Sequence, residues 1–369
     1  MKNSTMTILK ELAITSPDQK IFKRREIEGL ARGMGFTAKD FSMLFGSEYK
    51  IGRGVFDLTA VIQPAKTTSG TVVDIKPQMQ TFSNQERNYA VADPTFIPWG
   101  SFNDIVKIIK TEMFYPVFIS GLSGNGKTFM VEQACAKLKR EIIRVQVNPE
   151  TDEDDLLGGF RLVNGETVFS KGPVLKAMEN GAVLLLDEID RGTNKIMCLQ
   201  GILEGKPVLI KKTGETIKPA PGFTVISTAN TKGKGSEDGR FVAASIIDEA
   251  FLERFTISID QTFPNASTEL KILKKHAEKF GVQDPEFLDK LVQWADIIRK
   301  TFYDDGVDEV VSTRRLCHII QSYSIFDDRM KSIDLCISRF DEDTKLAFLD
   351  LYSKVDADAV LTEEDQNSN

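Results

Sequence analysis

The feature that most restricts how this chain folds is a glycine-rich octapeptide, GLSGNGKT, at residues 121–128. It follows an apolar run, VFIS at 117–120, and precedes a helical pattern over 129–138, so it joins a predicted strand to a predicted helix. Glycines in such a turn let backbone amides close around phosphate groups at the helix N-terminus, where the helix dipole also favours anions. The octapeptide therefore predicts a phosphate-binding loop between a buried strand and a helix.

Residues 121–129 also supply the predicted contacts to a nucleoside triphosphate and its metal ion. Lys127 would neutralise the β- and γ-phosphates, and Thr128 would ligate Mg²⁺. The cofactors expected from this segment are therefore ATP and Mg²⁺. The predicted nucleotide-binding residues are Gly121, Leu122, Ser123, Gly124, Asn125, Gly126, Lys127, Thr128 and Phe129.

A second apolar run, VLLLDEID at 183–190, ends in carboxylates. A parallel strand buried on both faces is continuously apolar, and ligands gather at its carboxyl end. We therefore expect Asp187 to hold Mg²⁺ through water and Glu188 to orient and deprotonate an attacking water molecule. A third run, FTVISTAN at 223–230, ends in Asn230, which is expected to contact the γ-phosphate or that water.

Short apolar runs, which include IIRVQV at 142–147, alternate with helical patterns over residues 93–263. This alternation predicts an α/β core with a mostly parallel sheet covered on both faces. Residues 264–355 then show helical periodicity without strands and predict a helical lid. The last segment, 356–369, carries five acidic and no basic residues, and we expect it to be a disordered acidic tail.

Residues 1–62 are predicted to form a separate small module. Apolar residues recur at helical spacing in 6–14, 21–34 and 36–45, and the alternating run YKIGRGVFDLTAVI follows them. Three short helices before a β-hairpin favour a winged-helix-like arrangement. Residues 63–92 are polar and lack periodicity, which is typical of a linker.

Composition limits what these modules bind. The chain has 369 residues and a formal charge of −7, which excludes a protein that coats nucleic acid with an overall basic surface. Residues 1–60, by contrast, carry ten Lys/Arg against seven Asp/Glu. Four cysteines without CxxC spacing and two histidines give no zinc framework and fit a reducing compartment. Since no apolar stretch reaches the ~18 residues of a membrane span, we expect a cytoplasmic protein that does not cross a membrane.

Taken in order, these motifs resemble those of AAA+ ATPases, which have a parallel-sheet P-loop core and a C-terminal helical lid. Within that family they look like the MoxR and chelatase branch, which includes the CobS-like ATPase subunits of aerobic cobaltochelatases. The segment GGFRLVNGETVF at 158–169 resembles the helix-2 insert of that branch, with a hairpin signal at Asn164-Gly165. A second hairpin is expected over 207–217, and the resemblance covers about residues 90–323.

The resemblance implies roles for further residues. Asn230 matches the sensor 1 residue, and Arg254, in Glu-Arg-Phe, matches the arginine finger that acts on the nucleotide of a neighbouring subunit. Arg314 matches the sensor 2 arginine of the lid, while Arg240 stays open as a rival finger and Arg315 as a rival sensor. The catalytic residues expected from motif and resemblance together are Glu188, Lys127, Asn230, Arg254 and Arg314, and the metal-binding residues are Thr128 and Asp187.

The expected function is Mg²⁺-dependent ATP hydrolysis by a homo-oligomeric ring, which by resemblance is a hexamer. The ring would remodel or activate a protein partner, such as a larger chelatase-type subunit or a complex under assembly. One alternative is a DNA-associated motor or regulator that binds nucleic acid through residues 1–62. A second is a nucleotide-sensing scaffold that does not hydrolyse ATP, but Glu188 beside Asp187 argues against it, because an inactive ATPase need not retain the acid that activates water.

Roles are also expected for three further features of the sequence. The hairpins around Asn164 and Thr213 are candidate contacts to the partner, and simple ring packing is the open alternative. Arg191 follows the acidic strand and is expected to face the subunit interface. Cys317 and His318 are neighbours on a predicted helix, so their side chains diverge and are expected to pack rather than to bind a metal.

Overall fold

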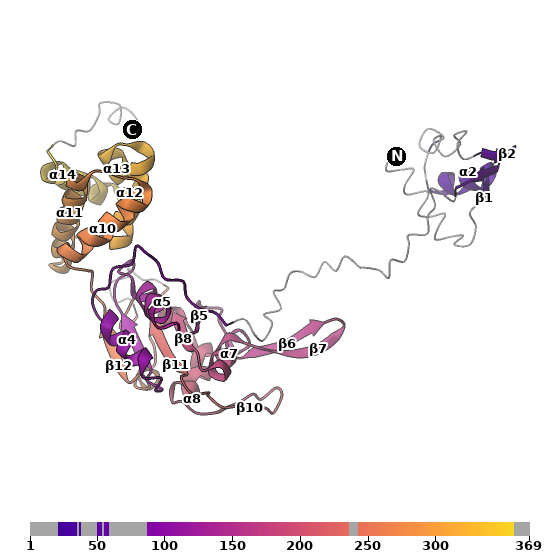
Figure 1. Ribbon diagram of the computed structural model, residues 1–369, viewed down its shortest axis with the longest axis horizontal. Coiled ribbons are helices and arrows are strands. Elements are labelled where there is room, and N and C mark those ends of the chain that lie inside the picture. The colour runs from indigo at the N-terminus through magenta and orange to yellow at the C-terminus, as the bar shows by residue number, and fades with distance from the viewer. Residues whose placement is uncertain are drawn as a thin grey trace. The chain divides into compact units, whose positions relative to one another are not determined.

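The computed structural model describes residues 21–34, 37, 50–53, 55–58, 87–235 and 243–357. The chain divides into two compact units, Met1–Glu86 and Arg87–Asn369 (Figure 1). The described part of the first unit is a small sheet with a helix, and the second unit holds the glycine-rich loop and the predicted lid.

The described part of the first unit consists mainly of one helix and a three-stranded antiparallel sheet. Its strand order is β1-β3-β2. The side chains of Phe22, Ile27 and Phe56 are buried and supply its apolar interior. The elements are β1 (Ile21–Lys23), α2 (Arg24–Gly33), β2 (Lys50–Gly52) and β3 (Val55–Asp57).

The prediction of a helix beginning at Ile21 is wrong at its first turn. Ile21 and Lys23 are exposed and Phe22 is buried, a period of two that suits a strand, and β1 pairs with β3 along its length. The hairpin expected after the helices is confirmed by β2 and β3. The helices predicted over 6–14 and 36–45 lie outside the described residues except for Thr37, so the winged-helix-like arrangement stays a prediction.

Five parallel strands form the central sheet of the second unit, in the order β12-β4-β11-β8-β5. Every neighbouring pair runs parallel, which confirms the predicted sheet. Four of the strands lie where the apolar runs of the sequence predict them. The strands are β4 (Val117–Ser120), β5 (Ile142–Gln146), β8 (Val183–Asp187), β11 (Thr224–Thr228) and β12 (Ile257–Asp260).

Alternate side chains of the three inner strands enter two separate hydrophobic cores. On β8, Leu184 and Leu186 join one core, while Val183 and Leu185 join the other. Both cores are closed by helices, so the sheet is covered on both faces as expected. The helices of this part are α4 (Phe102–Lys110), α5 (Lys127–Leu138), α6 (Glu153–Leu156), α7 (Pro173–Asn180), α8 (Gln200–Leu203) and α9 (Glu249–Leu252), with short 3₁₀ turns η3 (Ile189–Arg191) and η4 (Asn194–Leu199).

Two antiparallel hairpins interrupt the α/β pattern where the sequence predicts them. The longer one joins β6 (Gly158–Val163) to β7 (Glu166–Lys171) and extends outward from the sheet (Figure 1). Its turn is Asn164-Gly165, and both residues have positive φ angles, as a two-residue hairpin turn requires. The shorter one pairs β9 (Val208–Leu209) with β10 (Thr216–Ile217).

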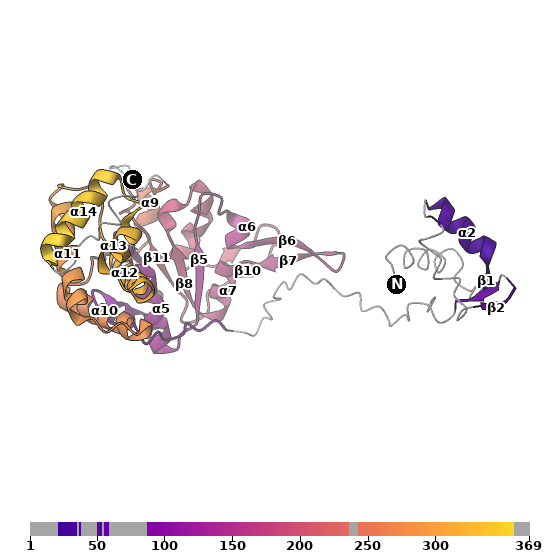
Figure 2. The same cartoon turned by 90° about the horizontal axis from the view of Figure 1, so that it is seen from above.

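Five helices form the lid as one bundle, orange to yellow in Figure 2. Their apolar faces meet in a single core around Trp294, whose indole N–H donates to the Phe348 carbonyl at 2.9 Å. This confirms the predicted helical region after the sheet. The helices are α10 (Ala266–Phe280), α11 (Pro285–Tyr303), α12 (Thr313–Phe326), α13 (Arg329–Ile337) and α14 (Glu342–Val355).

A buried ion pair ties three of these helices together. Arg299 on α11 donates two hydrogen bonds of 2.8 Å to the Glu269 carboxylate on α10, and a third of 2.9 Å to the Val311 carbonyl. The Thr313 hydroxyl, on the first turn of α12, donates to the same carboxylate at 2.6 Å. Because the charges are paired and hydrogen-bonded, the desolvation cost of burying them is offset.

The ends of the second unit differ from the predicted boundaries. The Asn88 carbonyl accepts a hydrogen bond from the Ile142 N–H at 2.9 Å, so residues 87–92, which the sequence assigns to the linker, begin the second unit. Asp356 is the first residue of the predicted acidic tail, yet it is buried against Arg329 and Tyr352. Both boundaries shift because single hydrogen bonds at a domain edge leave no periodic pattern in a sequence.

Breaking the buried pair of the lid is expected to destabilise it far more than breaking an exposed pair one residue away. Arg299→Met leaves the Glu269 charge buried without its cation, so we expect a loss of ~3–5 kcal/mol in the free energy of unfolding. Lys300→Met breaks only the exposed pair with Asp296 and should cost at most ~0.5 kcal/mol. Urea unfolding, followed by Trp294 fluorescence in a Trp99→Phe background, measures both changes. Equal losses in the two variants would contradict the prediction.

Candidate active site

The glycine-rich loop lies between β4 and α5, where the sequence predicts it. Gly124 and Gly126 have φ angles of +77° and +84°, a conformation that favours glycine, and α5 begins directly after them. The N-cap residue Gly126 has no side chain to cap α5, and the Lys127 N–H donates only a long hydrogen bond of 3.4 Å to the Asn125 side chain, so amides of the first turn stay available to an anion. Seven of the predicted nucleotide-binding residues, 123–129, line this cavity of about 300 Å³.

The loop is held in place by contacts that leave no room for side chains on its glycines. A Cβ atom at Gly126 would lie 2.5 Å from the Trp99 ring, and one at Gly124 would lie 2.5 Å from the Ser312 hydroxyl. The Arg314 N–H donates to the Gly124 carbonyl at 3.3 Å. The N-terminus of α12 in the lid therefore rests directly on the phosphate-binding loop.

Lys127 is largely buried and contacts neutral oxygens. Its ammonium group donates to the carbonyls of Gly121 and Leu122 at 2.6 and 3.0 Å, and to the Asn230 side chain at 3.3 Å. Burial lowers the pKa of Lys127 to about 8, against the attraction of the neighbouring carboxylates of Asp190 and Asp187. A phosphate group in the cavity would replace these carbonyls with a charged partner.

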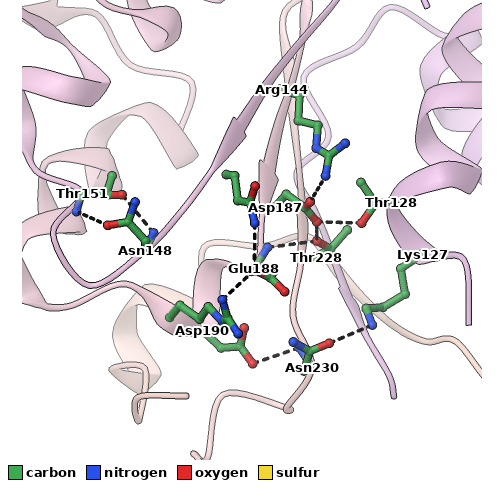
Figure 3. A network of polar contacts seen from close by, with 12 residues as sticks. Lys127, Thr128, Arg144, Asn148, Thr151, Asp187, Glu188, Asp190, Thr228 and Asn230 are labelled. Atoms are coloured by element: carbon green, nitrogen blue, oxygen red, sulfur yellow. Dashed lines mark hydrogen bonds and ion pairs between the residues drawn. The ribbon is translucent and has the colours of Figure 1, made fainter. Parts of the chain in front are cut away.

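Asp187 ends β8 and accepts hydrogen bonds on both carboxylate oxygens (Figure 3). One oxygen accepts from the hydroxyls of Thr128 and Thr228, at 2.7 and 2.5 Å, and the other from the Arg144 guanidinium at 2.5 Å. Burial alone would raise the pKa of Asp187, but these hydroxyls and the Arg144 charge hold it below its usual value. The carboxylate is thus kept ionised beside Thr128.

Glu188 follows Asp187 and faces the same cavity. Its backbone has a φ angle of +56°, and its N–H donates to the Thr228 hydroxyl at 3.2 Å. The side chain accepts a hydrogen bond from Gln146 at 3.2 Å and forms an ion pair with Arg191 at 3.2 Å. Arg191, expected at the subunit interface, therefore contacts the predicted water-activating acid within its own chain.

Asn230 follows β11 and links the glycine-rich loop to the acidic strand. Its side-chain oxygen contacts Lys127, and its backbone N–H donates to the Asp190 carboxylate at 2.9 Å (Figure 3). The structure thus brings together Lys127, Thr128, Asp187, Glu188 and Asn230 at the carboxyl edge of the sheet.

Arg314 is the lid arginine that faces the loop. It lines the cavity beside Lys127 and also a second cavity of about 390 Å³, whose other walls include Phe96, Trp99, Phe129 and both histidines, His276 and His318. Arg315 lines neither cavity, and burial together with the positive charge of Arg339 lowers its pKa. Geometry therefore favours Arg314 over Arg315 as the arginine that meets a nucleotide.

The second cavity also settles the place of the Cys317-His318 pair. Both residues contribute to its wall. Within the described ranges, no group of three or more His, Cys, Asp or Glu side chains is placed to hold a metal ion. The pair is therefore part of a mostly apolar pocket between the core and the lid, and the four cysteines are free thiols.

Arg254 lies on the turn after α9 and contacts its own subunit. It pairs with Glu204 at 2.9 Å and donates to the Ala250 carbonyl. Its side chain does not line the cavity of Lys127 and Glu188. Arg240, the rival finger, lies outside the described residues.

Four residues of the site were not singled out in the sequence: Arg144, Gln146, Asp190 and Thr228. Arg144 and Gln146 alternate on β5 and give one partner each to Asp187 and Glu188. Polar residues two apart at the carboxyl end of an otherwise apolar strand are a usable signal for such a site. Asp190 and Thr228 carried no comparable signal, because polar residues near strand ends are common in loops.

The donors gathered here suit a magnesium ion. Thr128, Asp187 and Glu188 offer hydroxyl and carboxylate oxygens, which are the ligands that Mg²⁺ prefers, and the glycine-rich loop offers space for the phosphates that would complete its coordination. The residues present therefore fit Mg²⁺, the ion that the loop motif implies.

Residues 116–255 match the family described as AAA domain (dynein-related subfamily). This match covers the glycine-rich loop, both acids, Asn230 and Arg254. Residues 116–255 therefore form an AAA domain, and the relatives named below support a MoxR/CobS-like AAA+ ATPase. The five-stranded parallel sheet and the helical lid of the structure agree with this assignment.

Three named proteins are similar in sequence to this part of the chain. Aerobic cobaltochelatase subunit CobS of Sinorhizobium sp is 28% identical over 58% of this chain and 66% of that protein. Protein NorQ of Paracoccus denitrificans (strain Pd 1222) is 29% identical over 64% of this chain and 83% of that protein. Midasin of Giardia intestinalis is 27% identical over 50% of this chain but only 4% of its own length. The match to CobS thus spans just under two thirds of that relative.

No helix in the described part of the chain is both long enough and apolar enough to span a bilayer.

Replacing Gly124 is expected to weaken nucleotide binding. Gly124→Ala places a methyl group against Ser312 and forces a residue with a side chain into a φ of +77°. Strain of this kind costs ~1–3 kcal/mol, so we expect a roughly 5- to 100-fold loss in affinity in titrations with a fluorescent ATP analogue and Mg²⁺. Gly201→Ala, in helix α8 with open space around it, is the matched control and should leave the affinity unchanged. Equal affinities for both variants would mean that the loop does not bind the phosphates.

Proposed function

We propose that this protein hydrolyses ATP with Mg²⁺ as a ring-forming AAA+ ATPase of the MoxR/CobS type, and that the ring acts on a protein partner. The observation that carries the proposal is the pair Asp187 and Glu188 at the end of β8, directly beside Lys127 and Thr128 of the glycine-rich loop. A site that only bound nucleotide would have no need of the second acid at this position.

The residues of the site divide the work of phosphoryl transfer to water. The loop amides and Lys127 bind the phosphates and fix the γ-phosphate in line for attack. Thr128 and Asp187 would hold Mg²⁺ beside the triphosphate. Mg²⁺, when bound with ATP, supplies positive charge that offsets the charge developing on the transferred phosphoryl group.

Glu188 would act as the general base. Its carboxylate is 28% exposed, so water reaches it, and Gln146 and Arg191 fix the position of Oε2 from two sides. From this place the carboxylate takes a proton from the attacking water while Asn230 orients that water from the neighbouring strand. Arg314 brings a further positive charge from the lid.

We propose that Arg254 serves a neighbouring subunit. Within its own chain the guanidinium is paired with Glu204 and lies outside the lining of the nucleotide cavity. A charge placed there can complete the site only across an interface between two copies. This supports the expected ring, for which we propose a hexamer, and it requires Arg254 to exchange Glu204 for the phosphates of the adjacent subunit.

We further propose that the partner is a larger protein subunit. The name of the CobS relative identifies it as a subunit of aerobic cobaltochelatase, and its similarity to this chain supports a comparable division of labour. The β6–β7 hairpin is a candidate contact, since Phe160, Leu162 and Val168 on it are 50%, 75% and 46% exposed. Exposed apolar side chains on a projecting hairpin suit contact with another protein surface.

ATP turnover against protein concentration, with mass photometry at each point, tests the ring and its chemistry together. Turnover per subunit should rise as rings form. Glu188→Gln removes the base and should lower turnover by at least ~10²-fold, and Arg254→Ala should lower it by ~10³-fold or more. Arg339→Ala, in an exposed arginine of the lid, is the control and should keep wild-type turnover.

Mixing the two inactive variants separates action within a subunit from action between subunits. Rings that contain both Glu188→Gln and Arg254→Ala subunits should regain part of the activity, because an intact base then sits beside an intact finger. Wild-type rings that form but turn over ATP only at background would refute the hydrolytic function. Mixed rings without any recovery would refute the finger acting between subunits.

A further inference from the structure

Asp190 is a buried carboxylate beside the site whose role the motifs do not explain. Its side chain is 0% exposed, and one of its oxygens accepts three hydrogen bonds from a single loop. These come from the N–H groups of Asn230 and Thr231, both at 2.9 Å, and from the Thr231 hydroxyl at 3.0 Å. Asp190 therefore binds the backbone of the loop that carries Asn230.

The same residue also fixes the other end of that loop. The Asp190 carbonyl accepts from the Ser245 N–H at 2.6 Å, and the Ile247 N–H donates to the Gly233 carbonyl at 2.8 Å. Residues 230–233 and 245–247 are thus drawn together over the 3₁₀ turn that follows the acidic strand. The position of the Asn230 amide depends on these bonds, because among the described residues its side chain has a hydrogen bond to Lys127 alone, at 3.3 Å.

The second carboxylate oxygen of Asp190 is buried without a hydrogen-bond partner among the described residues. Burying a carboxylate costs free energy, and leaving one oxygen unpaired adds to that cost. An aspartate that only capped the loop at this position would therefore lower the stability of the fold. A cost of this kind is typical of a residue retained to hold a functional group in place.

From these contacts we infer that Asp190 is a positioning residue for hydrolysis, which places Asn230 against the γ-phosphate and the attacking water by holding the backbone at residues 230 and 231. The inference rests on the proposed function. It assigns the effect to geometry and not to the charge of Asp190, although that charge also attracts Lys127.

Two substitutions separate geometry from charge. Asp190→Asn removes the charge but keeps an oxygen that accepts from both N–H groups, whereas Asp190→Ala removes every bond to the loop. We expect Asp190→Ala to lower kcat by ~10- to 100-fold, since a shift of about 1 Å in a catalytic group has effects of this size. Asp190→Asn should stay within about threefold of wild type, because neutral hydrogen bonds are weaker but keep the geometry. KM for ATP should change little in either variant.

A double variant tests whether Asp190 acts through Asn230. In an Asn230→Ala background, adding Asp190→Ala should cause no further loss of kcat. Asp356 provides the matched control, because it too is a buried aspartate with one oxygen that has no partner in the described part of the chain, but it lies in the lid against Arg329 and Tyr352. Asp356→Ala should lower the unfolding temperature without changing kcat per folded ring.

Hydrogen exchange of the nucleotide-free protein supplies a readout that does not depend on turnover. Amide exchange at residues 230 and 231 should accelerate in Asp190→Ala and stay slow in Asp190→Asn and in Asp356→Ala. Unchanged exchange in Asp190→Ala, equal loss of kcat in both Asp190 variants, or a full further loss in the Asn230→Ala background would each overturn the inference. A wild-type protein that does not turn over ATP would instead contradict the proposed function. Hydrogen exchange would then still test whether Asp190 holds the backbone at residues 230 and 231.

Discussion

Burial on both faces keeps charge out of the inner strands of the parallel sheet, and this constraint organises the second unit. The strands β4, β8 and β11 are buried along their whole length, and the one charged residue among them is Asp187, at the end of β8. Side chains at and beyond the carboxyl ends of these strands meet at one edge, where Lys127, Asp187 and Asn230 line the same cavity. The chemistry is concentrated at this edge because the buried lengths of the inner strands carry no other charge.

The lid is connected to the site by a series of contacts. The pair of Glu269 and Arg299 holds Thr313, which begins α12. Ser312 and Arg314, on either side of Thr313, meet Gly124 of the loop. A buried ion pair outside the lining of the cavity thus helps to determine how Arg314 approaches it, since the first turn of α12 cannot shift without breaking the bond to Glu269.

Sequence periodicity and motifs predict most helices and strands of the second unit. They also predict the site residues that belong to a recognisable motif. The strand before the glycine-rich loop, the two acids, the hairpin turn at Asn164 and the lid helices all lie where they are expected. Ile21 was misjudged because a three-residue strand has too few positions to display a period of two. Thr228 and Asp190 could not be found, because their importance arises from long-range hydrogen bonds that no local pattern encodes.

The balance of charge at the site explains why it needs positive charge from elsewhere. Arg144 is committed to Asp187 and Glu132, and Arg191 to Glu188, so these guanidinium groups mainly compensate acids of the protein itself. Lys127 contacts neutral oxygens, and Arg314 faces the cavity from the lid, which leaves two cations of the described chain directed at an incoming triphosphate. A triphosphate carries more negative charge than these two offset. A divalent ion and an arginine of another subunit are the sources that the proposed mechanism provides. Under that proposal, the negative charge of the triphosphate would be balanced only in the assembled, metal-bound state.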